Sequence, residues 1–298
     1  MNYRVLGSSG LNISEISFGC MSLGTDPTEN RLLLNKAIDN GINFFDTADI
    51  YGNGSNERLL GTVMKEKREQ VIISTKVGNQ LRPDGTGMDW NPRKDYILAS
   101  VEKSLQRLQT DYIDLYLLHG GTIDDPIDET IDAFETLKHQ GKILFYGISS
   151  IRPNVIREYV QRSRIVAVMM QYGLLDRRPE ESCFQLLGQN NIGVLARGSV
   201  AKGLIVNKPP KSFLNYSEHD VKQAAAAVSS ISGDERTAAQ TAIRFALQPP
   251  TVSSVVVGIR TMEQLDDAVK TIDSPLLTRE ELDTLKNSLP VNTYDQHR

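Results

Sequence analysis

The sequence predicts an eight-stranded α/β barrel, and two observations lead to this prediction. Eight short apolar or β-branched runs alternate with longer amphipathic stretches along the 298 residues, which is typical of parallel strands covered on both faces. No G-x-G-x-x-G motif follows a strand, and Gly52-Asn53-Gly54 and Gly85-Thr86-Gly87 lack the third glycine. This disfavours a doubly wound dinucleotide-binding sheet. We therefore expect one domain over residues 1–298, a (β/α)8 or TIM barrel.

The elements of the barrel follow from this alternation. The predicted strands are residues 16–20, 43–46, 71–76, 113–119, 143–149, 165–171, 193–196 and 254–258. Helices are predicted from apolar residues at three- to four-residue spacing. They span residues 29–40, 92–108, 126–140, 155–161, 179–189 and 235–247. Gly41 and Gly141 follow two of these helices, at a position where glycine commonly ends a helix.

Three segments lie outside the barrel repeat. The runs at residues 3–7 and 11–14 flank Ser8-Ser9-Gly10, which predicts an N-terminal β-hairpin that closes the bottom of the barrel. Residues 207–233 contain Pro209-Pro210 and several serines, and we expect an extended loop with one helical piece there. Residues 262–271 and 278–288 predict two extra helices at the C-terminal end.

Composition excludes several classes of protein. With 33 basic and 37 acidic residues the net charge is −4, so we expect no nucleic-acid partner. No apolar run is long enough to span a bilayer, and we expect no membrane partner and no secretory signal. Two cysteines fit a reducing, cytoplasmic compartment. The four histidines are scattered and predict no metal site. We expect a monomer.

Four polar residues are candidates for catalysis. Asp46, Lys76 and His119 each follow an apolar run, and Tyr51 lies five residues beyond Asp46. Taken singly, each has a structural explanation: a cap, a strand-end lysine, a hydrogen-bonded histidine or a packed loop tyrosine. The active site of a (β/α)8 barrel lies at the C-terminal ends of its strands. Their joint position at the ends of three successive strands therefore favours a shared site.

The sequence around these residues resembles the aldo-keto reductase family. The matching segments are Gly41 to Gly52 with Asn56-Glu57 and Leu60-Gly61, Ser74-Thr75-Lys76-Val77, Leu105-Gln106-Arg107-Leu108, Asp111 to Leu115, Leu118-His119, Gly141-Lys142-Ile143 and Gly147-Ile148-Ser149. They occur in the family's order from the Leu6-Gly7 turn to the Gly258 region. The continuation His119-Gly120-Gly121 is similar to bacterial general-stress-type, NADP-dependent members.

The resemblance implies reduction of an aldehyde or ketone by NADPH, with Asp46, Tyr51, Lys76 and His119 as the catalytic residues. A free tyrosine has a pKa of roughly 10. In such a site Lys76 would lower the pKa of Tyr51, and Asp46 would keep Lys76 charged and oriented. Tyr51 would then act as the general acid, and His119 would hydrogen-bond the carbonyl oxygen. The nicotinamide would supply the hydride.

The resemblance also implies a set of NADP contacts along the strand ends. These residues are Gly19, Cys20, Met21, Asp46, Ser149, Gln171, Tyr172, Arg197, Gly198, Val200, Lys202, Gly203, Gly258, Arg260, Gln264 and Asp267. Ser149 and Gln171 would bind the carboxamide, and Tyr172 would stack on the nicotinamide. Arg260 would pair with the 2′-phosphate at a helix N-terminus. The sequence departs from the family at Ser150 and Ala268, where asparagine is usual.

Two other functions remain open from the residues alone. A lysine at the end of a barrel strand, such as Lys76, can also form a Schiff base with a carbonyl substrate, so a lyase is one alternative. The family further contains regulatory barrels that bind NADP and channels without turnover. The resemblance implies a small carbonyl substrate, and the residues do not specify which one. Barrel geometry predicts that Met21, Trp90 and residues 80–90, 120–125 and 207–233 form the rim of its pocket.

Overall fold

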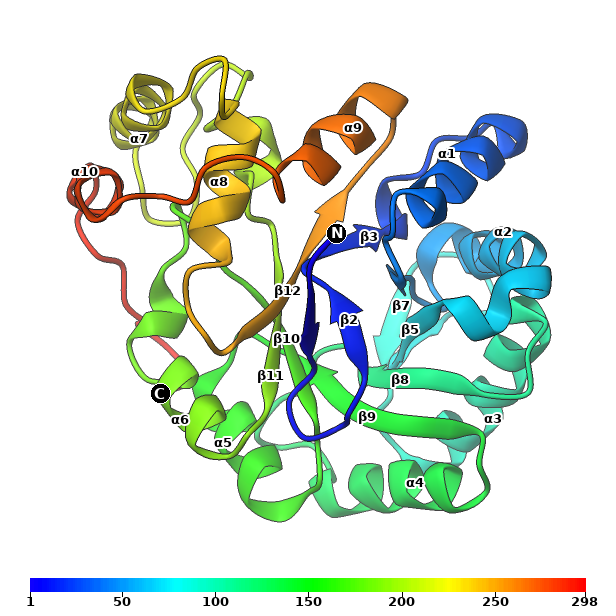
Figure 1. The fold of residues 1–298 in the computed structure, drawn as a ribbon. Helices are drawn as coiled ribbons and strands as arrows, with labels where there is room; N and C mark the ends of the chain where they lie inside the picture. The colour runs from blue at the N-terminus through cyan, green and yellow to red at the C-terminus, as the bar shows by residue number, and fades with distance from the viewer.

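Eight parallel strands close into a barrel in the computed structural model, which describes residues 1–298 (Figure 1). The barrel strands are β3 (Ile16–Gly19), β4 (Phe44–Asp46), β5 (Ile72–Val77), β8 (Ile113–Leu118), β9 (Ile143–Ser149), β10 (Ala167–Gln171), β11 (Gly193–Arg197) and β12 (Val252–Gly258). They neighbour one another in chain order, and β12 pairs with β3 to close the barrel. All eight predicted strands are confirmed.

Helices surround the barrel and cover its outer face (Figure 1). They are α1 (Pro27–Asp39), α2 (Ser55–Met64), α3 (Lys94–Leu108), α4 (Ile127–His139), α5 (Pro153–Arg162), α6 (Cys183–Gln189), α7 (Glu218–Ser230), α8 (Ala238–Ala246), α9 (Met262–Lys270) and α10 (Arg279–Asn287). The sequence did not predict α2, because the residue before it, Gly54, is left-handed and provides no side-chain cap. The two expected C-terminal helices are α9 and α10.

The N-terminal hairpin lies across the bottom of the barrel, as predicted. It pairs β1 (Tyr3–Val5) with β2 (Asn12–Ser14). Leu6 and Ile13 are fully buried in one apolar cluster with Phe44, Leu115 and Leu117 from barrel strands. In Figure 1 the hairpin, in dark blue, stands in front of the strands. Its side chains thus fill one end of the barrel, which leaves the other end for a site.

Two segments expected as pocket rim contain regular structure. Residues 79–90 form a second hairpin, in which β6 (Asn79–Leu81) pairs with β7 (Met88–Trp90). Within residues 207–233, α7 takes up thirteen residues and starts with a capping box between Ser217 and Asp220. The remainder is irregular, so the expected loop with a helical piece is confirmed. None of the helices is both long and apolar enough to cross a membrane.

Candidate active site

A buried ion pair joins the ends of β4 and β5. The Nζ atom of Lys76 donates to Oδ2 of Asp46 at 2.7 Å and to the carbonyl oxygen of Thr47 at 2.7 Å. The other carboxylate oxygen of Asp46 accepts from the Ser74 hydroxyl at 3.1 Å. The Lys76 side chain is 1% exposed and that of Asp46 7%. Each charge is therefore removed from water but provided with a partner, as a stable buried pair requires.

The loop after β4 brings Tyr51 to this ion pair. Lys76 Nζ lies 3.4 Å from the Tyr51 hydroxyl oxygen and 4.9 Å from the centre of its ring. Tyr51 begins a short turn in which Gly52, Asn53 and Gly54 all have positive φ, at 55°, 51° and 81°. Glycine adopts this left-handed conformation readily and asparagine tolerates it. The turn reverses the chain immediately after Tyr51 and leads into α2.

His119 completes the group from the end of β8. Its ring lies edge-on to Tyr51, with centroids 6.0 Å apart and an interplanar angle of 82°. The backbone of His119 is held by a hydrogen bond to Val77 at 2.7 Å, and its carbonyl accepts from the Asn79 side chain at 3.2 Å. The Nδ1 atom is buried and has no protein partner. The structure thus brings together all four predicted catalytic residues.

Burial dominates the electrostatics of the site. It lowers the pKa of His119 to about 3, with further lowering by Lys76 and Arg197, so the imidazole is neutral. Burial also raises the pKa of Tyr51 above its ordinary value, although Lys76 acts in the opposite direction. Lys76 thus acts on the Tyr51 pKa in the expected direction, but burial outweighs it. For Lys76, burial acts to lower the pKa, but Asp46 and Tyr51 outweigh it and the ammonium stays charged.

Polar side chains from β10 and β11 extend the site. Gln171 donates through Nε2 to Asp176 at 2.9 Å and accepts at Oε1 from Arg197 at 3.3 Å. Arg178 in turn forms a bidentate ion pair with Asp176, at 2.8 and 2.7 Å. Gln171 and Arg197, two of the predicted cofactor contacts, therefore lie together at the ends of adjacent strands. Sequence reasoning missed Asp176, whose only signal was an acidic residue shortly after the strand-end glutamine.

The loop after β11 has the backbone shape of an anion site. Val200 has φ −91° and is followed by Ala201, Lys202 and Gly203 at 46°, 58° and 90°. The N–H groups of Ala201 and Gly203 donate to the carbonyls of Gly198 and Val200 at 2.9 and 2.7 Å, whereas no backbone acceptor takes the N–H of Lys202. A turn of this shape leaves a backbone N–H and the lysine side chain for phosphate oxygens. Gly198, with φ 76°, is exposed and packs beside the Gln171 side chain.

A third group of predicted residues surrounds the N-terminus of α9. Gly258 and Arg260 are exposed, and Arg260 forms no ion pair. Gln264 accepts from the Arg260 backbone N–H at 2.9 Å, which ties the loop to the first turn of the helix. Asp267 accepts through Oδ1 from Thr237 and Gln240, both at 2.9 Å, which leaves Oδ2 without a protein partner.

Two predicted cofactor contacts are corrected by the structure. Tyr172 is 2% exposed, its ring packs against Phe184 and Phe245, and its hydroxyl donates to Glu180 at 2.8 Å. Successive strand residues face opposite sides, so Tyr172 points away from the barrel mouth while Gln171 points toward it. Stacking of Tyr172 on a nicotinamide is therefore wrong. Cys20 is also fully buried, so its thiol is unavailable to a ligand.

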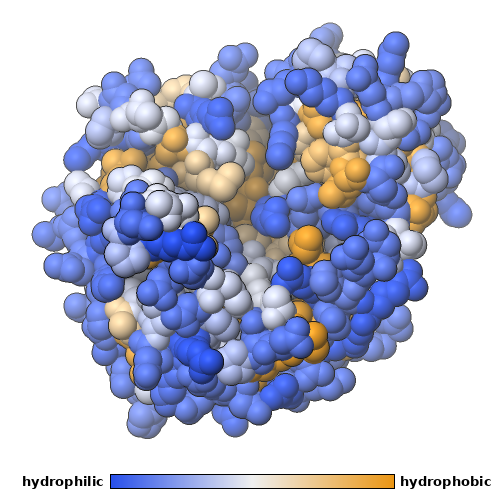
Figure 2. Space-filling model, turned by 180° about the vertical axis from the view of Figure 1, so that it is seen from behind, coloured by the Kyte–Doolittle hydropathy of each residue, from blue (hydrophilic) through white to orange (hydrophobic).

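The remaining predicted contacts occupy the same end of the barrel. Gly19 and Gly258 are paired neighbours at the ends of β3 and β12, and Ser149 ends β9. Met21, directly after β3, is 68% exposed. Figure 2 shows the side of the molecule away from the N-terminal hairpin, where hydrophobic residues line part of a hollow. Exposed apolar side chains in the segments that follow the barrel strands at this end include Met21, Met88 and Ile123.

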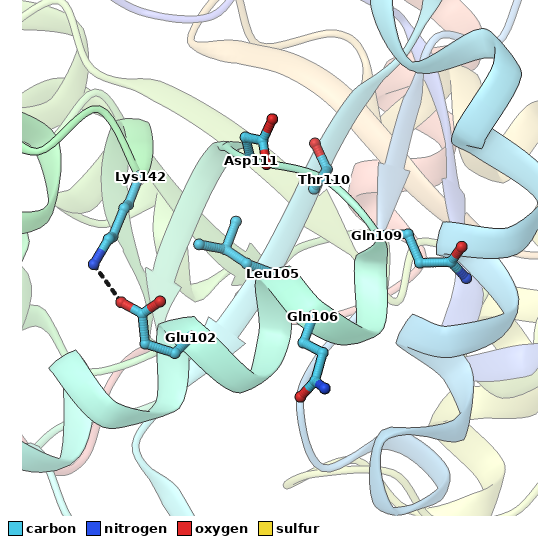
Figure 3. Close-up of a pocket in the computed structure, with 7 residues that line it drawn as sticks. All are labelled: Glu102, Leu105, Gln106, Gln109, Thr110, Asp111 and Lys142. Atoms are coloured by element: carbon cyan, nitrogen blue, oxygen red, sulfur yellow. Dashed lines mark hydrogen bonds and ion pairs between the residues drawn. The ribbon is translucent and has the colours of Figure 1, made fainter.

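A separate surface groove lies at the opposite ends of the strands (Figure 3). It measures ≈ 480 Å³ and is lined by Glu102, Leu105, Gln106, Gln109, Thr110, Asp111 and Lys142. Asp111 precedes β8 and Lys142 precedes β9, so the groove borders the starts of these strands. Lys142 and Glu102 point toward each other and form an ion pair across it. Barrel enzymes place their chemistry at the other end, so we assign no catalytic role to this groove.

Comparison with known proteins agrees with this geometry. The model of the aldo/keto reductase family matches residues 15–289. The chain belongs to the aldo-keto reductase family. An uncharacterized oxidoreductase of Bacillus subtilis (strain 168), YqkF, is 45% identical over 307 aligned residues that cover 100% of both chains. The predicted family is therefore confirmed.

Solved structures of an aldo-keto reductase support the same assignment. The holo form of AKR11C1 from Bacillus halodurans is 46% identical, with a TM-score of 0.94 over 100% of this chain and 99% of the other. Its apo form is 43% identical, with a TM-score of 0.85 over the same shares. As an aldo-keto reductase, the chain is an oxidoreductase of a family that acts on carbonyl substrates and typically uses NAD(P)H.

Proposed function

We propose that this aldo-keto reductase reduces small aldehydes or ketones to alcohols with NADPH, and that Tyr51 is the general acid. The observation that carries the proposal is the contact of Lys76 with both Asp46 and Tyr51. This arrangement holds a cation beside a phenol, as proton donation by tyrosine requires. The neutral His119 ring lies edge-on to the same tyrosine.

The residues at the strand ends fit an NADP molecule. Arg260 is exposed and unpaired beside the first turn of α9, whose N–H groups have no partners within the helix. A cation at a helix N-terminus suits the adenosine 2′-phosphate. The left-handed loop at residues 201–203 suits the pyrophosphate. Gln171 and Ser149 would hold the carboxamide. The TM-score of 0.94 with a structure described as a holo form supports this assignment.

The further predicted contacts belong to the same proposal. Gly19, Met21, Gly198, Val200, Lys202, Gly203, Gly258, Gln264 and Asp267 would line the path of the cofactor, with Arg197 beside Gln171. Asp46 would border the cofactor from its position beside Lys76, with which it forms an ion pair. When bound, the nicotinamide would supply the hydride.

The protein's own residues would supply the proton and the charge stabilisation. Tyr51 is protonated at neutral pH, because its pKa is not below the ordinary value of about 10, so its hydroxyl can donate to the carbonyl oxygen. Lys76 would stabilise the phenolate that forms, and Asp46 together with the Thr47 carbonyl orients the ammonium. A neutral His119 carries one N–H, which would hydrogen-bond the substrate oxygen and set its angle.

A Schiff-base reaction on Lys76 is disfavoured by its surroundings. The ammonium donates to Asp46, Thr47 and Tyr51, and its pKa is raised above the ordinary value. A lysine nucleophile needs a neutral amine, which requires a lowered pKa. With a side chain 1% exposed, Lys76 also offers a substrate no direct approach.

The proposal is tested by cofactor titration followed by turnover. We expect NADPH to quench or shift the protein fluorescence at micromolar concentration and NADH to bind more weakly. Small aldehydes should then cause loss of nicotinamide absorbance. Tight NADPH binding without turnover of any aldehyde or ketone would support the regulatory alternative. Borohydride trapping of a carbonyl compound on Lys76 would instead support a lyase.

A further inference from the structure

A buried ion pair behind the barrel wall has no part in the proposed chemistry. Glu57, in the first turn of α2, is 0% exposed. Its Oε2 accepts from Nε of Arg107, on α3, at 2.5 Å. Its Oε1 accepts from the Thr75 hydroxyl, on β5, at 2.6 Å. One carboxylate thus joins two helices to a barrel strand.

The Thr75 contact connects this carboxylate to Lys76. Thr75 directly precedes Lys76 in β5, and successive strand side chains face opposite sides of a sheet. Thr75 therefore points outward to Glu57, while Lys76 points inward to Asp46. Because the two residues share a peptide bond, a fixed Thr75 side chain also fixes the backbone from which the lysine extends.

The Arg107 contact connects the same carboxylate to Tyr51. A Cβ atom on Gly54 would lie 2.6 Å from Cδ and 2.9 Å from Nε of Arg107. The arginine side chain is therefore packed directly against the turn that begins at Tyr51. That turn contains three successive left-handed residues, Gly52, Asn53 and Gly54. Arg107, oriented by Glu57 and by Ser104 at 3.0 Å, supports it from behind.

We propose that Glu57 is a positioning residue that sets the separation of the Tyr51 hydroxyl and the Lys76 ammonium. This inference rests on the proposed function, because the distance between the two groups matters only if Tyr51 donates a proton beside Lys76. One carboxylate holds the carriers of both groups: Thr75 for Lys76, and Arg107 with Gly54 for Tyr51. Buried ion pairs contribute little net stability compared with well-packed apolar residues. We therefore explain the buried Glu57 by the positions that its contacts fix and not by added stability.

A second buried ion pair offers a matched control. Arg68 donates to Asp114 at 2.6 Å, with side chains 12% and 7% exposed, and Asp114 also accepts from the Ile73 backbone at 2.9 Å. This pair joins β8 to the start of β5, at the end of the barrel away from Tyr51. Asp114→Asn therefore disturbs a comparable buried pair without touching the catalytic group.

The test compares steady-state kinetics and NADPH binding in four variants and the wild type. The variants are Glu57→Gln, Thr75→Val, Thr75→Ser and Asp114→Asn. We expect kcat to fall roughly tenfold or more in Glu57→Gln and by less in Thr75→Val, with KM and the NADPH Kd within about twofold of wild type. Thr75→Ser keeps the hydroxyl and should restore kcat. Asp114→Asn should lower the unfolding midpoint and leave kcat unchanged.

A pH profile separates positioning from loss of folded protein. The groups facing Tyr51 are Lys76, Asp46, His119 and Arg197. If Lys76 moves away in Glu57→Gln, it stabilises the phenolate less, and the alkaline break in kcat should shift to higher pH. A smaller amount of folded enzyme would scale the profile without shifting it.

Three results would overturn the inference. They are an unchanged kcat per folded enzyme in Glu57→Gln, an unshifted alkaline break, or equal kcat in Thr75→Val and Thr75→Ser. If Glu57→Gln does not fold, the threonine pair alone decides, because valine is nearly isosteric. A wild type that turns over no carbonyl compound would instead contradict the proposed function.

Discussion

The ammonium of Lys76 lies 3.4 Å from the hydroxyl oxygen of Tyr51. This distance is long for a strong hydrogen bond. It is nevertheless short enough for the cation to stabilise a phenolate when the proton leaves. The tyrosine is protonated at neutral pH, since its pKa is not below about 10, so the pair combines a proton donor with a cation placed where negative charge would develop.

The hydroxyl of Tyr51 can be removed with little change in shape. In Tyr51→Phe we expect kcat for aldehyde reduction to fall ~10²- to 10⁴-fold, because the general acid is lost. The NADPH Kd should stay close to wild type. Stopped-flow or steady-state assays with matched fluorescence titration measure both quantities. A kcat within tenfold of wild type would assign the proton donor to another group.

Loss of Lys76 leaves the Asp46 carboxyl buried without its ion-pair partner. We expect Lys76→Met to destabilise the fold by about 3 to 5 kcal/mol at pH 8. Burial already raises the pKa of Asp46, so protonation at lower pH should reduce this deficit. Urea unfolding followed by circular dichroism at pH 5.5 and pH 8 measures the effect.

The double variant Asp46→Asn/Lys76→Met serves as the control for this experiment. It removes both charges, and we expect it to be more stable than Lys76→Met alone. Equal stability of the two variants would show that the buried carboxylate is not the source of the deficit.

His119 should stay neutral throughout the physiological range. Burial, Lys76 and Arg197 lower its pKa from 6.5 to about 3. Its folded pKa lies below the unfolded one, so any stability linked to His119 is present above pH 6.5 and is lost as pH falls toward 3. We expect the His119 ring proton in an NMR titration to show no transition between pH 5 and 8. A midpoint inside this interval would contradict the neutral hydrogen-bond donor proposed here.

The raised pKa of Asp49 should make the free energy of unfolding depend on pH near neutrality. Burial and Glu57 raise its pKa from 3.8 to about 7, against the opposing effect of Arg107. Because the folded pKa is the higher one, its stabilisation is present below pH 3.8 and is lost as pH rises through about 7. Relative to Asp49→Asn, the wild type should lose on the order of 2 kcal/mol between pH 5 and 8. Parallel stability curves for the two proteins would refute this.

Substitution of Arg260 tests whether the enzyme prefers NADPH to NADH. Its guanidinium is exposed and forms no ion pair, so Arg260→Ala removes no structural contact of that group. A charge-assisted bond to a phosphate contributes about 1.5 to 3 kcal/mol, so the NADPH Kd should rise roughly tenfold or more. The NADH Kd should not change. A parallel loss for both nucleotides would place Arg260 away from the 2′-phosphate.

The sequence predicted the site better than it predicted individual side-chain directions. Asp46, Lys76 and His119 each follow an apolar run, and parallel strands bring the ends of these runs to one face of the barrel. The predicted stacking of Tyr172 on the nicotinamide was wrong because neighbouring residues of a strand face opposite sides. No pattern in the sequence shows which of Gln171 and Tyr172 faces the barrel mouth. The hairpin at residues 79–90 escaped notice because its two short strands pair only with each other.

The sequence by itself determined the barrel, its strand order and the grouping of Asp46, Lys76 and His119, since all depend on local periodicity and parallel topology. Tertiary structure decided what surrounds them. Glu57 meets Thr75 across 18 positions of sequence and Arg107 across 50. Such contacts depend on how α2 and α3 pack on the barrel, which no local pattern specifies. The neutral state of His119 follows chiefly from burial, and burial exists only once the chain has folded.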